Sequence, residues 1–93
     1  MALLDLLGRR WALRVLWELR DAPVATFRDL QARCDGVSSS VLADRLRELG
    51  DAGIVVRSDD GYALTAQGAD LLSHLTPLDK WAGRWAARNG RSA

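Results

Sequence analysis

The segment from Val37 to Gly68 constrains the fold more than any other part of the chain, because signals for helix starts, helix stops and strands follow one another within it. Ser38 has a side chain that favours the N-cap position, so a helix is expected from Ser39 to about Asp51. Gly53 follows the expected end of this helix, where a residue without a side chain is common. The segment is therefore predicted to start as a capped helix with a defined stop.

Two short strands are expected next, in Ile54 to Ser58 and Tyr62 to Leu64, which are rich in β-branched and aromatic residues. The run Asp59 to Gly61 separates them, and an Asp-Gly pair between such strands is a strong hairpin signal. Thr65 then offers a hydroxyl group as the N-cap of the last helical region. The predicted order is helix, hairpin, helix.

The chain before this segment is also predicted to be helical. A first apolar group is interrupted by Gly8, and a second has helical spacing up to a break at Asp21 to Pro23. Thr26 is expected to cap a short helix from Phe27 to about Cys34, with Asp29 completing a capping box. The apolar residues of the two groups are Leu3, Leu4, Leu6 and Leu7, and Ala12, Val15, Leu16 and Leu19.

The last helical region reaches Pro77, where we expect a kink or a restart because proline lacks the N–H that a helix interior needs. Beyond it, Leu78, Trp81 and Trp85 fall at positions i, i+3 and i+7 and form an apolar stripe. This stripe is predicted to contribute to a homodimer interface, with packing within one chain as the alternative.

These elements predict one domain, residues 1–93, that is mainly α with a small β-hairpin, an α+β fold. The arrangement is a winged helix-turn-helix, with the helix-turn-helix at about 26–51 and the wing at 54–64. The terminal helices, at about 3–20 and 66–88, are predicted to form a dimer interface. A helix beside a β-hairpin is a common way to place side chains in a DNA groove.

Composition excludes several other classes of protein. The apolar content is 48% without a run of 18 apolar residues, so no membrane span is expected. The first residues lack the layout of a signal peptide, which predicts a cytoplasmic location. A single histidine and a single cysteine provide no metal-ligand spacing and no internal disulfide, so no metal is expected. His74 has no nucleophile partner, and paired carboxylates and a phosphate loop are missing, so neither catalysis nor a cofactor is expected.

The helix from Ser39 to Asp51 has two different faces at 100° per residue. An apolar stripe of Leu42, Leu46 and Leu49 is predicted to face the core. Asp44 lies on the other face, where DNA phosphates would repel its carboxylate unless it accepts a hydrogen bond from a cytosine amine or pairs with an arginine. The candidate base readers are Ser39, Ser40, Ala43, Asp44 and Arg47, of which Arg47 is the strongest. The alternative is that these are ordinary solvated positions on a helix that packs on the core.

Phosphate contacts are expected from residues beside this helix. Arg57 lies on a predicted strand and Arg28 near the start of the preceding helix. The helix starts capped by Thr26 and Ser38 carry unpaired amides that attract phosphate. The acidic hairpin tip is not expected to enter a minor groove. Surface ion pairs worth about 0 to 1 kcal/mol are the alternative for both arginines.

The near-neutral charge of the helix from Ser39 to Asp51 keeps a second class of function open. A DNA-binding domain more often has a clearly basic face. The alternative is a winged-helix module that binds another protein through the same surface or through its tryptophan-lined ends.

The terminal segments carry two tryptophans each, more aromatic surface than one small core is expected to cover. Aromatic anchors are enriched at interfaces, so a homodimer is predicted, and two copies could read half-sites roughly 34 to 36 Å apart. Packing within one chain is the competing interpretation. A dimer could also enclose a pocket for a small aromatic effector, lined by Trp11, Trp17 or Trp81. The predicted interface residues are Leu3, Leu4, Leu7, Trp11, Leu78, Trp81 and Trp85.

The sequence resembles the HxlR-type winged-helix regulators of the MarR-like group. The motifs are LLGRRWALRVLWEL, the helix at Phe27 to Leu30, GVSSSVLADRLREL with AGIV, and GYALTAQGADLL with LTPLDKWA. The resemblance implies a DNA-binding homodimer held by the first and last helices, acting in bacterial transcription. It also implies a recognition helix from Ser39 to Gly50, with Arg45 and Arg57 on basic sites and Trp11 on the first-helix tryptophan.

Three departures accompany the resemblance. Ser40 stands where the family often has a basic residue, and the wing, with Asp59 to Gly61 at its tip, is shorter than usual. Redox-sensing members use a cysteine ahead of the first helix, whereas the one cysteine here is Cys34. A reactive or disulfide-forming Cys34 is one hypothesis, and a partly buried structural thiol is the favoured alternative.

Overall fold

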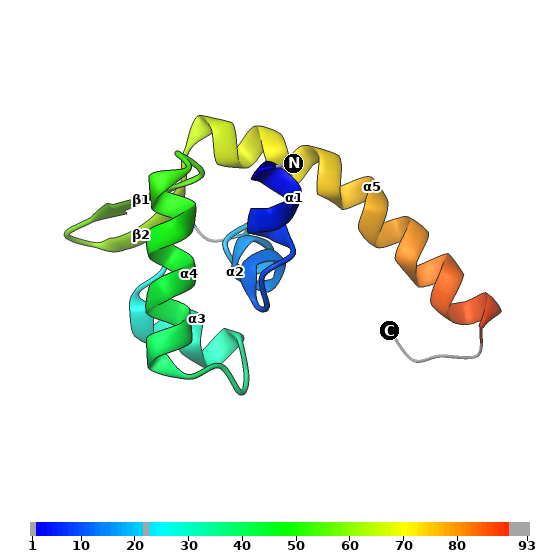
Figure 1. Ribbon diagram of the computed structural model, residues 1–93, viewed down its shortest axis with the longest axis horizontal. Coiled ribbons are helices and arrows are strands. Elements are labelled where there is room, and N and C mark those ends of the chain that lie inside the picture. The colour runs from blue at the N-terminus through cyan, green and yellow to red at the C-terminus, as the bar shows by residue number, and fades with distance from the viewer. Residues whose placement is uncertain (1, 22, 90–93) are drawn as a thin grey trace.

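The computed structural model describes residues 2–21 and 23–89, which form five helices and one hairpin (Figure 1). The fold matches the predicted class, mainly helical with a two-stranded antiparallel sheet. The elements in chain order are α1 (Ala2–Leu7), α2 (Ala12–Glu18), α3 (Phe27–Arg33), α4 (Ser39–Asp51), β1 (Val55–Ser58), β2 (Gly61–Leu64) and α5 (Ala66–Arg88).

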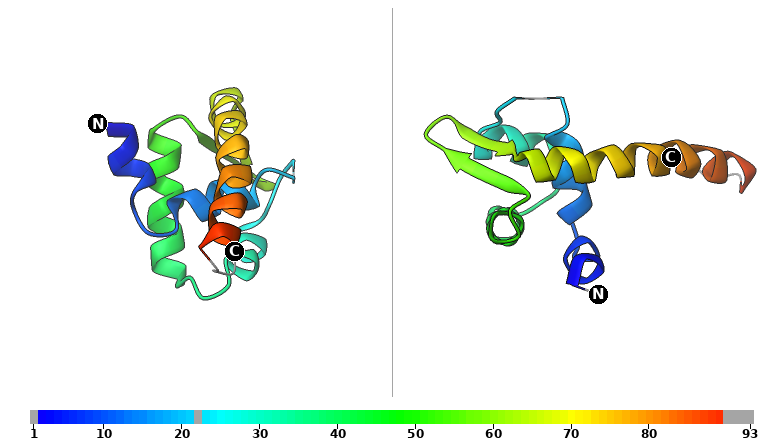
Figure 2. Two further views of the ribbon diagram at one scale, coloured as in Figure 1. Left: turned by 90° about the vertical axis from the view of Figure 1, so that its right-hand side faces the viewer. Right: turned by 90° about the horizontal axis from the view of Figure 1, so that it is seen from above.

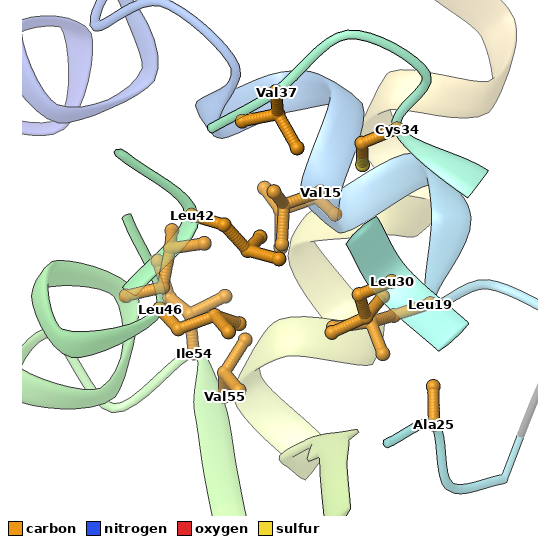
Figure 3. Close-up of a cluster of buried hydrophobic side chains, with 12 residues drawn as sticks. Val15, Leu19, Ala25, Leu30, Cys34, Val37, Leu42, Leu46, Ile54 and Val55 are labelled. Carbon is orange, nitrogen blue, oxygen red and sulfur yellow. The ribbon is translucent and has the colours of Figure 1, made fainter. Parts of the chain in front are cut away.

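The core lies where α2, α3, α4 and the start of β1 meet (Figure 3). The apolar stripe of α4 is buried there, as its spacing predicted, and Leu42 and Leu49 are fully covered. Each such leucine contributes roughly 1.5–3 kcal/mol through burial. Because this packing fixes one face of α4, the opposite face is the one that remains available to a ligand.

Side-chain caps start three of the helices at the predicted residues. Thr26 Oγ1 accepts from the Asp29 N–H at 3.0 Å, and Asp29 Oδ2 accepts from the Thr26 N–H at 3.2 Å, which completes the capping box. Ser38 Oγ accepts from the backbone N–H three residues further on at 3.2 Å, and Thr65 does the same at 3.0 Å. These bonds satisfy backbone donors that a helix start leaves unpaired.

The hairpin has a two-residue tip of Asp59 and Asp60, since Ser58 pairs with Gly61. The sequence prediction put Gly61 in the turn, whereas the structure makes it the first residue of β2, with a φ of +134°. A Cβ there would lie 2.5 Å from the carbonyl oxygen of Ala25, so both the conformation and the space require glycine. Ala25 is bridged to the next residue of β2, which fixes the hairpin to the linker before α3.

Pro77 lies inside α5, which continues as one helix of 23 residues. Of the two alternatives that the sequence left open, a kink or a restart, the restart is therefore wrong. Figure 1 shows that α5 changes direction along its length, as a helix with an internal proline commonly does. Thr76 Oγ1 donates to the Leu72 carbonyl oxygen at 3.2 Å just before the proline. In the right-hand view of Figure 2 the C-terminal part of α5 extends away from the hairpin. Of the helices in the described ranges, none is long and apolar enough to cross a bilayer.

Candidate nucleic-acid interface

The outer face of α4 is polar and open to solvent. Ser39 and Ser40 lie exposed in its first turn, directly after the N-cap, and Ala43 is exposed one turn further on. Arg47 is the most prominent side chain, with 65% of its surface exposed. The hairpin lies along one flank of α4, and α1 and α2 lie along the other (Figure 1). This face can therefore meet a groove while flanking elements reach its borders.

Asp44 and Arg47 form an ion pair on this face, with Asp44 Oδ1 3.1 Å from Arg47 Nη1. The sequence left open whether Asp44 would need an arginine as its partner, and the structure supplies one. An exposed pair at i, i+3 contributes only a few tenths of a kcal/mol, so Arg47 can leave it for a base edge at little cost. While the pair holds, Asp44 limits the attraction of Arg47 for phosphate.

Arg45 lies on the flank of α4 and is the most buried of these cations, with 15% of its side chain exposed. Its Nη1 lies 3.1 Å from Oε1 of Glu48, and Arg9 Nε lies 3.3 Å from Oε2 of the same carboxylate. The first contact is an ion pair without hydrogen-bond geometry, since Arg45 Nε and Glu48 Oε1 are both buried without a hydrogen-bond partner. Arg45 is thus part of a cluster with Glu48 and Arg9 rather than a freely projecting side chain.

Arg28 and Arg57 make no ion pair with any residue that the structure describes. Arg28 is exposed in the first turn of α3, beside the capping box of Thr26. The Arg57 guanidinium lies 5.7 Å from the centre of the Tyr62 ring. Arg57 and Tyr62 line a groove of about 420 Å³ between α4 and the hairpin, together with Ala43, Leu46, Arg47, Gly50, Asp51 and Val55.

A second cavity, of about 530 Å³, lies on the other flank of α4, beside the turn between α1 and α2. Arg9 and Arg10 belong to that turn, and sequence reasoning missed both of them as site residues. The available signal was the pair of adjacent arginines directly after the helix-breaking Gly8. The cavity is lined by Arg9, Arg10, Trp11, Gly36, Ser38, Val41 and Arg45.

The predicted dimer residues divide into two groups. Leu3, Leu4, Leu78, Trp81 and Trp85 are exposed apolar residues on the terminal helices. Leu7 and Trp11 are partly buried and pack against the core of their own chain, which is the competing interpretation that the sequence allowed. Part of the predicted interface is therefore covered already within the monomer.

The exposed group is concentrated on the C-terminal half of α5. The Trp81 and Trp85 rings are stacked, with centroids 6.4 Å apart and planes 13° from parallel. Leu78 is 53% exposed and lines an apolar groove of about 370 Å³ between α2 and α5. The other lining residues are Leu13, Arg14, Trp17, Leu72, Leu75, Asp79 and Ala82.

Cys34 is fully buried at the end of α3, and this burial raises the pKa of its thiol. A thiol that stays protonated and out of reach of solvent is a poor nucleophile. The structure therefore supports the structural interpretation of Cys34 and gives the redox hypothesis no basis.

His74 is exposed on α5, with its Nε2 3.9 Å from Asp70 Oδ1. Within the described ranges, no three His, Cys, Asp or Glu side chains gather closely enough to hold a metal ion.

A helix with one buried face and one polar exposed face, preceded by a short capped helix and followed by a hairpin, defines the winged helix-turn-helix class. The chain belongs to the HxlR-like helix-turn-helix family, whose model matches residues 6–90. This confirms the resemblance in the sequence.

Relatives agree with this assignment. The HTH-type transcriptional regulator YvaP of Bacillus subtilis is 31% identical over 88 residues, which cover 87% of this chain and 81% of YvaP. The quinone-bound structure of B. subtilis YodB superposes with a TM-score of 0.82 at 31% identity, over 89% of this chain and 93% of that one. A protein described as a possible HxlR family transcriptional factor from Thermoplasma volcanium gives 0.85 at 28% identity, over 91% and 82%. The family and these relatives are transcriptional regulators rather than enzymes, as the sequence indicated.

Proposed function

We propose that this protein is a homodimeric, sequence-specific DNA-binding repressor that acts in the cytoplasm. Its binding target is a pseudo-palindromic operator in double-stranded DNA. Membership of a family of transcriptional regulators supports the general role. The observation that carries the proposal is the exposed polar face of α4, held outward by the buried leucine stripe on the opposite face of the same helix.

The DNA contacts are assigned by position on and around α4. Arg47, Asp44, Ser39 and Ser40 project from the face that enters the major groove and are the base readers. Backbone contacts come from Arg28 with the helix start at Thr26, from Ser38, from Arg57 and from Arg45.

A second copy is proposed to cover the exposed apolar residues of α1 and α5. A chain of this size gains stability from a partner, and buried aromatic anchors are typical of the centre of an interface. Two-fold symmetry then places two copies of α4 on neighbouring half-sites about one helical turn apart, roughly 34 to 36 Å. Such a dimer blocks polymerase without any further contact surface, which is why repression is proposed.

A small aromatic effector is proposed to bind the apolar groove between α2 and α5. Trp17 and four leucines line this groove, and its position beside Leu78 places it at the edge of the proposed dimer interface. The quinone-bound state of YodB is a precedent among similar structures. An effector there can change the distance between the two copies of α4 and so weaken operator binding.

Arg47→Ala tests the assignment of the base readers. Its affinity is measured on a duplex that the wild-type protein selects from a random pool and on an unselected duplex. Loss of a bidentate contact to guanine is expected to cost about 1–3 kcal/mol on the selected duplex and much less on the unselected one. Arg57→Ala is the matched control, since a phosphate contact is lost about equally on both.

Equal losses for Arg47→Ala on both duplexes would refute its role as a base reader. If the wild-type protein bound no duplex even at low salt, where backbone contacts are strongest, the DNA-binding proposal itself would fail. The protein-interaction module would then be the remaining candidate.

A further inference from the structure

We propose that the turn between α1 and α2 holds a phosphate-binding pocket for the DNA backbone, on the flank of α4 opposite the hairpin. The inference rests on the proposed function, since it concerns how the same duplex is held. It assigns DNA contacts to Arg9 and Arg10, which lie outside both the helix-turn-helix and the wing.

The lining of the pocket favours an anion. Three of its seven residues, Arg9, Arg10 and Arg45, carry a positive charge, and none of the seven is acidic. Glu48 lies behind them and pairs with Arg9 and Arg45, so a net positive charge is left. Arg10 has no hydrogen bond or ion pair to any described residue.

A buried donor in the wall has no acceptor. The Nε–H of Arg45 is covered by the protein but makes no hydrogen bond. A buried donor without an acceptor is unfavourable, and a bound ion nearby is one of the reasons why such a group can persist. Phosphate oxygens are strong acceptors for guanidinium donors. A phosphate in the pocket would meet the exposed guanidinium of Arg10, while the covered Arg45 adds positive charge behind it.

The turn is held in shape before any ligand arrives. Trp11 has a φ of +77°, an uncommon conformation for a bulky side chain that persists only where its surroundings enforce it. Its ring packs close to Gly36 in the α3–α4 connection, and the Arg10 guanidinium lies 5.9 Å from the ring centre. The pair Arg9–Glu48 ties the same turn to α4. The cationic side chains are thereby kept beside the start of α4.

The two flanks of α4 match the two borders of a major groove. An α-helix with its side chains is about 10–12 Å across and the groove about 12 Å wide, so backbone phosphates lie on either side of an inserted helix. Arg57 lies on the hairpin flank, in the protein groove that Ala43 and Gly50 also line, and can contact phosphates on that side. The pocket lined by Val41 and Arg45 lies on the opposite flank and can hold a phosphate there. The backbone of one DNA strand would then contact the wing, and the backbone of the other DNA strand would contact the α1–α2 turn.

Arg10→Ala tests the pocket without disturbing the Glu48 cluster. Binding of the intact protein to a random-sequence duplex is measured across a salt series, with Arg20→Ala as the control. Arg20 follows Leu19, the C-cap of α2, and lines neither the pocket nor the two grooves. We expect Arg10→Ala to make the negative slope of log K against log[salt] shallower by about 0.9 per protomer. It should also weaken binding to selected and random duplexes by the same factor. Arg10→Lys, which keeps the charge, should retain the slope.

A slope for Arg10→Ala equal to that of the wild type and of Arg20→Ala would overturn the pocket while leaving the DNA-binding function intact. Thermal stabilisation by inorganic pyrophosphate that Arg10→Ala abolishes, together with an unchanged DNA slope, would assign the pocket to a free anion and also overturn the proposal. Failure of the wild-type protein to bind any duplex would instead defeat the proposed function on which the pocket rests.

Discussion

At the scale of single residues, charge pairing distinguishes the arginines around α4. Arg47 is held by Asp44 in an exposed pair, and Arg45 is held by Glu48 in a largely covered one. Arg10 and Arg57 have only an aromatic ring as their partner within the described residues. Arg10 and Arg57 lie on the flanks, as does the paired Arg45, whereas the exposed pair of Arg47 lies at the centre. This arrangement suits phosphate contacts at the border of a DNA groove and selective contacts inside it.

Cys34 gives a prediction at the same scale. Its thiol should react with a disulfide reagent in the native protein only as fast as the protein opens, because burial shields the sulfur and raises its pKa. Reaction should be complete at once in denaturant. The measurement is the release of coloured thiolate with and without guanidinium, and fast reaction of the folded protein would restore the redox hypothesis.

At the scale of the elements, the helix starts were predictable because capping is local. Thr26, Ser38 and Thr65 each bond to an amide three residues ahead, so the relevant groups lie within a few letters of the sequence. The continuation of α5 through Pro77 and the pairing of Gly61 with Ser58 were not predictable in this way. The pairing of Gly61 depends on its close approach to Ala25, a residue of a distant segment. A proline within a helical pattern is compatible with either a kink or a restart, so its residue type does not decide between them.

The same limit applies to the site. The outward face of α4 follows from the period of its leucines, and Arg47 and Asp44 could be placed on it from the sequence alone. The pocket at Arg10 could not, because its walls come from the α1–α2 turn, the α3–α4 connection and α4. Periodicity assigns residues to faces of one helix but does not state which turn packs beside that helix.

The capping box of α3 provides the prediction for this scale. Thr26→Ala should lower the free energy of unfolding by about 1 kcal/mol, which is typical for loss of an N-cap. Hydrogen bonds from the backbone and side chain of Thr26 lower the pKa of Asp29 below its usual value of 3.8. Because the pKa is lower in the folded state, the contribution of Asp29 is present above the unfolded pKa and is lost as the pH falls through the folded one.

Asp29→Ala should therefore reduce the melting temperature at neutral pH, and the difference from wild type should shrink below about pH 4. Thermal unfolding followed by circular dichroism from pH 7 down to pH 2 measures this. Asp35→Ala, at an exposed carboxylate that caps no helix, is the control. A difference for Asp29→Ala that is independent of pH would contradict the role of its charge.

At the scale of the whole molecule, the structure is asymmetric: a compact core is joined to a long terminal helix that leads away from it. The core and the interface face of α4 occupy one end, and the exposed apolar residues of α5 occupy the other (Figure 1). DNA recognition and assembly are thus assigned to separate parts of one small chain. A variant can therefore be designed to change the residues of one part without changing those of the other.

The double variant Leu78→Ser and Trp81→Ser tests assembly. Removal of two central anchors is expected to weaken dimerisation by at least about 2 kcal/mol, or roughly 30-fold, as for interface hot spots. Sedimentation at several protein concentrations measures the change, with circular dichroism to verify folding. Val56→Ser is the matched control, because Val56 is similarly exposed but lies on the hairpin. A wild-type protein that sediments as a monomer at every concentration would refute the proposed interface.

The stacked pair of Trp81 and Trp85 has a practical consequence. Indole emission moves to shorter wavelength when the ring is removed from water. Both rings are partly exposed to solvent in the single chain and lie in the proposed dimer interface. Dilution of the protein should therefore shift its fluorescence to the red without any added label. The wavelength of the tryptophan emission should therefore report dimerisation, and it can be followed while DNA or a small aromatic compound is titrated.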